Sequence, residues 1–323
     1  MPRADLIVSL VKAGSQGDQK LFRSTVEAIA AEERSKRHNI LADRLVENLR
    51  AGGGPKPTEV SRSFDGGHGG LLFEIEPRRS LDSIIVDAEV SRPILELIEE
   101  QQRREVLRSY GLEPRHRLLL SGPPGNGKTT MAEAIASELM VPLFVVRYES
   151  VIGSFLGETS GRLKRLFDFV RTHDCVLFFD EFDTLGKERG DTYETGEIKR
   201  VVSSLLLQID ALPSHVVVVT ATNHSELLDR AVWRRFQIRL ALSAPSLQQR
   251  TAWFERFEKR LGTRLGVTPR TLATKLNAAS FSDLELFCED VYRRFVLDLP
   301  DADLPKIIAA RLQQWKNRIT IIN

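Results

Sequence analysis

Apolar and polar residues follow a pattern along the central part of the chain that predicts strands and helices in turn. Short, almost wholly apolar runs such as VVVV at 216–219 are typical of strands buried on both faces, as in a parallel sheet between helix layers. Segments with apolar residues three or four positions apart separate these runs and predict amphipathic helices. The predicted strands are 117–121, 143–147, 175–180, 216–221 and 236–242, and the predicted helices between them are 128–139, 159–172 and 196–210. The fold class is therefore α/β, with a doubly wound parallel sheet.

Helical regions flank this predicted sheet on both sides. Helical spacing at Phe22, Val26 and Ile29 predicts an N-terminal helical module over residues 1–50. Glycine, proline and polar residues dominate 51–70, which we interpret as a flexible linker. The α/β subdomain is predicted over 71–243, with a short strand at 71–77 and a helix at 91–110 before the first parallel strand. Only helical patterns follow, so 244–323 are predicted to form a small all-helical subdomain.

Composition and charge narrow the class of protein. The 323 residues are 42% hydrophobic and 28% charged, as in an ordinary globular protein, and the net charge of +2 argues against a nucleic-acid or membrane-surface partner. No apolar run approaches the length of a membrane span. The two cysteines, Cys175 and Cys288, have no metal-binding spacing and suggest no disulfide framework. These features together predict a cytoplasmic protein.

Residues 122–130 read GPPGNGKTT and come directly after a predicted strand and at the start of a predicted helix. Glycines let the backbone wrap a triphosphate with its N–H groups toward the oxygens, and the helix adds the positive end of its dipole. Lys128 would reach the β- and γ-phosphates, and the Thr129 hydroxyl would ligate Mg²⁺. The bland alternative is a glycine-rich turn with a solvated lysine. The pattern predicts binding of ATP with Mg²⁺ by Gly122, Pro123, Pro124, Gly125, Asn126, Gly127, Lys128, Thr129 and Thr130.

Polar residues also follow two other predicted strands. Within CVLFFDEFD (175–183), the apolar strand ends in Asp180 and Glu181, at the sheet edge where ligands of such folds bind. Asp180 would hold Mg²⁺ through water, and Glu181 would orient and deprotonate the attacking water. Asn223 would reach the γ-phosphate or that water. The alternatives are a solvated turn for the two carboxylates and, for Asn223 with Ser225, a cap on the next short helix.

Adjacent arginines precede the last predicted strand in LDRAVWRRF, at Arg234 and Arg235. Paired guanidinium groups suit the negative charge that develops on a transferring phosphoryl group. The alternative interpretation is a solvated basic turn.

With these motifs assembled, residues 75–320 resemble an AAA+ ATPase, and more narrowly the AAA subgroup of protein remodellers. GPPGNGKT matches the Walker A motif, FFDEFD matches Walker B, and Asn223 stands at sensor 1. The adjacent arginines are similar to those of the katanin, spastin and vacuolar-sorting ATPases. The resemblance implies that Arg234 and Arg235 act in trans on a neighbour's nucleotide, and that the active form is a ring, usually a homohexamer.

The resemblance extends to a substrate-binding loop. Phe155, Leu156 and Gly157 match the aromatic–hydrophobic–glycine core of the family's first pore loop, which implies a polypeptide substrate gripped at the centre of the ring. The alternative is that Phe155 and Leu156 pack onto their own domain. Residues 184–196 are assigned to a second pore loop. Ile84 and Ile85, with residues of the helical subdomain, are assigned to the adenine pocket.

Three functions are consistent with these motifs. The leading hypothesis is a ring-forming ATPase that unfolds, threads or disassembles proteins. The second is an ATP-switched recruiter of a separate effector, such as a protease or defence protein, that binds a partner or adaptor through residues 1–50. The third is a DNA-acting loader or transposition helper, against which the balanced charge and the Phe-Leu-Gly loop both argue.

Overall fold

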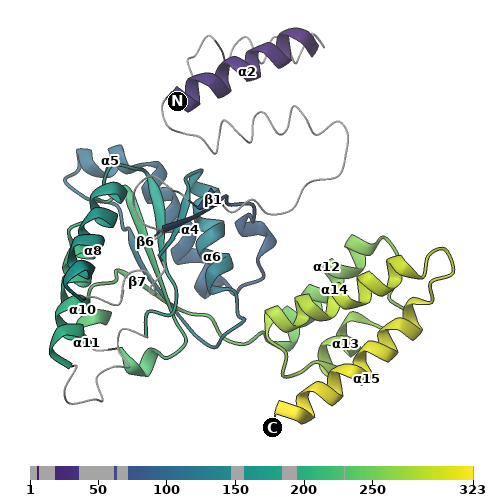
Figure 1. The fold of residues 1–323 in the computed structure, drawn as a ribbon. Helices are drawn as coiled ribbons and strands as arrows, with labels where there is room; N and C mark the ends of the chain where they lie inside the picture. Colours follow the sequence, from purple (N-terminus) through teal and green to yellow (C-terminus); the bar gives the residue numbers. More distant parts are fainter. Residues whose placement is uncertain are drawn as a thin grey trace.

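The computed structural model describes residues 6, 19–35, 62–63, 72–146, 156–183, 195–228 and 230–322 (Figure 1). Near the N-terminus it contains helix α2 (Gln19–Ser35), in which Val26 and Ile29 are buried. The helix predicted from their spacing is therefore confirmed. None of the described helices is long and apolar enough to span a membrane.

A seven-stranded sheet forms the body of the protein, in the order β1-β2-β4-β5-β6-β3-β7. Strands β4, β5, β6, β3 and β7 run parallel to one another. At one edge of the sheet, β2 pairs antiparallel with β4, and β1 pairs antiparallel with β2. The strands are β1 (Arg62–Ser63), β2 (Leu72–Ile75), β3 (Arg117–Ser121), β4 (Leu143–Val146), β5 (Cys175–Phe179), β6 (Val216–Thr222) and β7 (Ile238–Ala241). All five parallel strands were predicted. Strand β1 lies inside the segment interpreted as a linker, whose composition does not indicate a strand.

Helices cover both faces of the sheet, as the apolar strands require (Figure 1). Leu118 and Leu120 of β3 point to the face covered by α4 (Ala88–Gln102) and α6 (Lys128–Leu139). Leu119 points to the opposite face, which is covered by α8 (Leu156–Val170) and α10 (Thr195–Asp210). The period of two along the strand thus divides the core into two layers.

Short elements connect these layers. The helix predicted at 91–110 is two helices, α4 and α5 (Arg104–Ser109), separated at Arg103, whose φ of −107° and ψ of 24° are not helical. The other short elements are η1 (Leu81–Ser83), η2 (Ser225–Leu227) and α11 (Arg230–Trp233).

The C-terminal part of the chain is the predicted all-helical subdomain, which we call the lid. It consists of α12 (Leu247–Leu261), α13 (Pro269–Lys275), α14 (Phe281–Leu297) and α15 (Leu304–Ile322). Its own core contains Phe254 and Phe287, whose rings meet edge to face at 6.1 Å. Capping boxes at Ser246 and Ser280 begin α12 and α14.

Phe287 tests whether the lid depends on this separate core. We expect Phe287→Ala to lower the free energy of unfolding by about 3–5 kcal/mol, because the ring is buried and leaves a cavity. The control is Leu286→Ala, one residue away on the same helix and 48% exposed, with an expected change of about 0.5 kcal/mol or less. Urea unfolding followed by tryptophan fluorescence measures both. Equal losses for the two variants would contradict the assignment of a lid core.

Candidate functional site

The loop between β3 and α6 begins at a point where only glycine fits. Gly122 has a φ of +138°, and a Cβ atom there would lie 2.1 Å from the carbonyl oxygen of Leu242. Its amide donates to the carbonyl of Thr222 at 3.2 Å. The loop therefore starts wedged between the ends of β6 and β7, with its backbone turned toward the edge of the sheet.

Lys128 begins α6 and folds its side chain back over this loop. Its Nζ donates to the carbonyl oxygens of Gly122 at 2.7 Å and Pro123 at 3.0 Å. Burial lowers the pKa of the Lys128 ammonium, while the carboxylates of Asp180 and Asp183 act in the opposite direction. A buried cation held by two neutral carbonyls is suited to exchange them for phosphate oxygens.

The carboxylates predicted after β5 lie beside this loop. The Thr129 hydroxyl donates to Asp180 Oδ2 at 3.4 Å, so the two residues predicted to hold Mg²⁺ are adjacent. Asp180 Oδ1 accepts the amide of Glu181 at 2.9 Å. Glu181 is exposed and has a φ of +48°, a strained conformation for a residue other than glycine that costs roughly 1–3 kcal/mol. Such strain is concentrated at functional sites. Here the strained residue carries an exposed carboxylate and lies at the carboxyl edge of the sheet.

Asn223 directly follows β6, the strand that pairs with β5. Its side-chain Oδ1 is buried and has no hydrogen-bond partner among the described residues. It does not cap the next helix, because the residue before η2 is His224 and no side chain caps it. The alternative interpretation of Asn223 and Ser225 as helix caps is therefore wrong. A buried, unpaired amide oxygen is costly unless a ligand or water meets it.

Asp183 is a residue of this site that the sequence analysis did not assign. It is buried and accepts the hydroxyl of Thr222 at 3.0 Å and the amide of Asn223 at 3.3 Å. It thereby ties the loop after β5 to the loop after β6 and orients Asn223. The signal was present in the sequence as the second aspartate of DEFD.

The lid contacts the phosphate loop directly. The amide of Ser282 donates to the carbonyl of Gly125 at 2.9 Å, and a Cβ atom on Gly125 would lie 2.7 Å from Ser280 Oγ. Arg79 of the α/β subdomain also contacts the lid, through an ion pair of 3.0 Å with Glu285 of α14. No arginine stands between Ser280 and Leu284, so the lid meets the loop through backbone and serine atoms.

The remaining predicted residues lie apart from this cluster or outside the described residues. Ile84 and Ile85 are half-buried, and Ile84 packs against the core next to α6. Phe155 lies outside the described residues, as does most of the predicted second pore loop, and Leu156 and Gly157 begin α8. Arg234 is exposed and Arg235 is partly buried.

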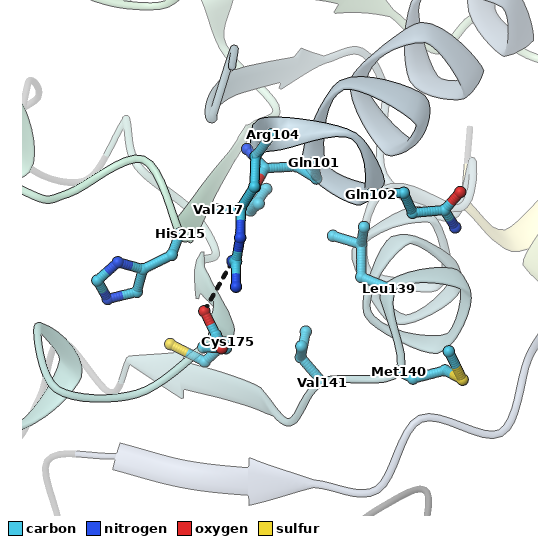
Figure 2. A pocket seen from close by; sticks show the side chains of 10 residues that line it. Gln101, Gln102, Arg104, Leu139, Met140, Val141, Cys175, His215 and Val217 are labelled. Carbon is cyan, nitrogen blue, oxygen red and sulfur yellow. Dashed lines mark hydrogen bonds and ion pairs between the residues drawn. The ribbon is translucent and has the colours of Figure 1, made fainter. Parts of the chain in front are cut away.

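A pocket of about 230 Å³ lies at the opposite, amino-terminal edge of the sheet (Figure 2). Arg104 extends along it to an ion pair with Asp174 at 3.0 Å, and Leu139, Val141 and Val217 supply apolar walls. None of the predicted nucleotide-binding residues lines it. We therefore place the functional site at the phosphate loop.

Comparison with known proteins agrees with this geometry. Residues 118–244 match the family described as "ATPase family associated with various cellular activities (AAA)". The chain is 35% identical over 305 residues to the AAA family ATPase y4kL of Sinorhizobium fredii, a match that covers 92% of this chain and 91% of that protein. The chain belongs to the AAA family of ATPases. It accordingly binds nucleotide and hydrolyses ATP, as the motifs predicted.

More distant relatives share the AAA domain. The chain is 32% identical over 191 residues to a cell division cycle protein 48 homolog of Archaeoglobus fulgidus, covering 58% of this chain and 26% of that protein. It is 37% identical over 132 residues to the peroxisomal ATPase pex6 of Schizosaccharomyces pombe, covering 39% of this chain and 14% of that protein. The crystal structure of the FIGL-1 AAA domain has the same fold, with a TM-score of 0.58 and 23% identity over 75% of this chain and 85% of that one.

Lys128→Ala tests the phosphate loop. We expect nucleotide affinity to fall at least about 100-fold, because the ammonium group of Lys128, which folds over this loop, is removed. Isothermal titration calorimetry with ADP measures the change. The control is Lys164→Ala on α8, whose side chain is exposed, and which should bind ADP like the wild type. Undiminished ADP binding by Lys128→Ala would remove the loop from nucleotide recognition.

Proposed function

We propose that this AAA ATPase assembles into a homohexameric ring and uses ATP hydrolysis to unfold, thread or disassemble protein substrates. In this proposal each subunit supplies the nucleotide site and the base, and its neighbour supplies an arginine. The close arrangement of Lys128, Thr129, Asp180 and Glu181 supports a nucleotide site with its base within one subunit. The position of the arginine pair supports the contribution from the neighbour.

Within one subunit, the residues near the phosphate loop suit the binding and cleavage of a triphosphate. Thr129 and Asp180 offer adjacent oxygen ligands of the kind Mg²⁺ prefers, and the ion would neutralise charge on the phosphates. Glu181 lies next to Asp180 with an exposed carboxylate, and we assign it as the base that takes a proton from the attacking water. Asn223 Oδ1, buried and unpaired, would orient that water.

The arginine pair lies far from this site in its own subunit, and this observation carries the ring proposal. Arg235 forms an ion pair with Asp210, which also binds Arg117 at 2.7 Å. Arg117 is the first residue of β3, whereas the phosphate loop follows the last, so the two ends are separated by roughly 16 Å of strand. This separation supports the proposal that the arginines serve another subunit's nucleotide.

Protein substrates are proposed from the resemblance of Phe155, Leu156 and Gly157 to a pore loop, together with the family relationship. An exposed aromatic side chain at the centre of a ring can grip an extended polypeptide without regard to its sequence. We assign the N-terminal module, residues 1–50, to recruitment of a substrate, an adaptor or a partner effector. A cytoplasmic location remains part of this proposal.

Glu181→Gln tests the catalytic base. We expect the ATP turnover number to fall about 10²- to 10⁴-fold, because the amide cannot accept a proton, while ATP affinity stays within about threefold of the wild type. A coupled phosphate-release assay and equilibrium nucleotide binding measure the two quantities. Glu255→Gln, an exposed glutamate on α12, is the matched control and should hydrolyse ATP normally. Turnover at the wild-type rate in Glu181→Gln would exclude this residue as the base.

Phe155→Ala separates threading from recruitment of an effector. We expect substrate-stimulated turnover and unfolding of a tagged fluorescent protein to be lost, because the aromatic grip is gone, while basal ATP hydrolysis falls less than about threefold. Single-turnover unfolding of the tagged substrate is the measurement, with Phe155→Tyr as the conservative control. If Phe155→Ala still processes substrate, the recruiter interpretation replaces threading.

A further inference from the structure

The two neighbouring arginines at the end of α11 have different surroundings, which separates their roles. Arg235 lies against α10, where its Nη1 pairs with the carboxylate of Asp210 and donates to the carbonyl of Leu206 at 3.4 Å. Arg234 is exposed, and its guanidinium has no acceptor within the part of the chain that the structure describes. One guanidinium is therefore held within its own subunit and the other extends into solvent.

The turn that carries both arginines is fixed on either side. The amide of Arg235 donates to the carbonyl of Val232 at 3.1 Å, which continues the turn of α11. Phe236, almost completely buried, packs edge to face against Phe182 at 6.1 Å. The Gln237 side chain then accepts the amides of His116 and Arg117, at 3.0 and 3.1 Å. Between these anchors, the Arg235–Asp210 pair and the bond to Leu206 join the turn to α10.

Asp210 is suited to this anchoring role because it joins two cations. Its Oδ1 accepts Arg117 Nη1 at 2.7 Å, and its Oδ2 pairs with Arg235. Burial lowers the pKa of the Arg117 guanidinium, so this partly desolvated arginine needs the carboxylate as a counterion. Arg117 thereby keeps Asp210 in place, and Asp210 in turn keeps Arg235 in place.

We propose that Asp210 holds Arg235 within its own subunit and thereby positions Arg234 as the guanidinium that reaches the neighbouring subunit's nucleotide. This inference rests on the proposed ring, in which one subunit supplies an arginine to its neighbour's nucleotide site. Arg235 and Asp210 are then positioning residues, and Arg234 is the catalytic one. Because a misplacement of about 1 Å can cost about 100-fold in rate, loss of the anchor lowers turnover although neither anchor residue touches the nucleotide.

The test compares ATP turnover, ADP affinity and melting temperature in single variants. We expect Arg234→Ala to lower kcat at least about 100-fold without changing ADP affinity or melting temperature. Arg235→Ala and Asp210→Asn should each lower kcat by less, about 3- to 30-fold. A variant that combines Arg235→Ala with Asp210→Asn should lose no more kcat than either single variant. Asp210→Glu, which keeps the charge, should recover most of the rate lost in Asp210→Asn.

Two comparisons keep the test independent of folding. Arg235→Ala leaves the Asp210–Arg117 pair intact, so its loss of rate cannot come from an exposed Arg117 charge. Asp168→Asn, an exposed carboxylate on the neighbouring helix α8, removes the same charge elsewhere and should leave turnover at the wild-type level.

The outcomes distinguish this inference from the ring proposal. If Arg235→Ala is as severe as Arg234→Ala while Asp210→Asn turns over normally, Arg235 acts on the neighbour directly and the anchoring inference fails. Mixing Arg234→Ala with Glu181→Gln subunits should restore part of the activity if the ring proposal holds, because each supplies what the other lacks. Full turnover in both single arginine variants, together with no gain on mixing, would overturn the ring proposal itself.

Discussion

Strand β3 is hydrogen bonded on both sides, to β6 and to β7, over Leu118–Ser121. This parallel pairing places the loops after β3, β5 and β6 at one edge of the sheet, and the candidate nucleotide site lies among those loops. The amide of Gly122 bonds to the carbonyl of Thr222, and the amide of Leu242 bonds to that of Ser121, so the phosphate loop is tied to both neighbours. A shift of one residue in this register would turn every core side chain to the wrong face.

The two edges of the same sheet have different chemistry. At the carboxyl edge, Lys128, Asp180 and Glu181 surround the place where phosphates are expected. At the amino edge, Asp210 holds the base of the arginine turn. Because a rigid sheet lies between them, one subunit cannot fold its arginine onto its own phosphates. In the proposed ring, a neighbouring subunit would complete each site, and hydrolysis would then depend on how neighbouring subunits pack.

The lid is hydrogen bonded to the phosphate loop and to the segment before α4. Ser282 donates to the carbonyl of Gly125 inside the phosphate loop, and Arg256 donates to the carbonyl of Ser83 at 2.8 Å. The Arg79–Glu285 pair is solvent-exposed, and such pairs contribute only about 0–1 kcal/mol. The lid has its own core, and the hydrogen bonds and the ion pair named here join it to the α/β subdomain.

What the sequence determined by itself was local. Each parallel strand and the loop at 122–130 could be predicted because apolar runs and glycine spacing report on neighbouring residues along the chain. The break at Arg103 and the strand at 62–63 could not be predicted. The contact between Arg117 and Asp210 joins residues 93 positions apart, and no periodicity encodes such a pairing. Which arginine is held and which extends was therefore decided only by the tertiary structure, because packing of α10 against the sheet brings the carboxylate to one of two chemically identical side chains.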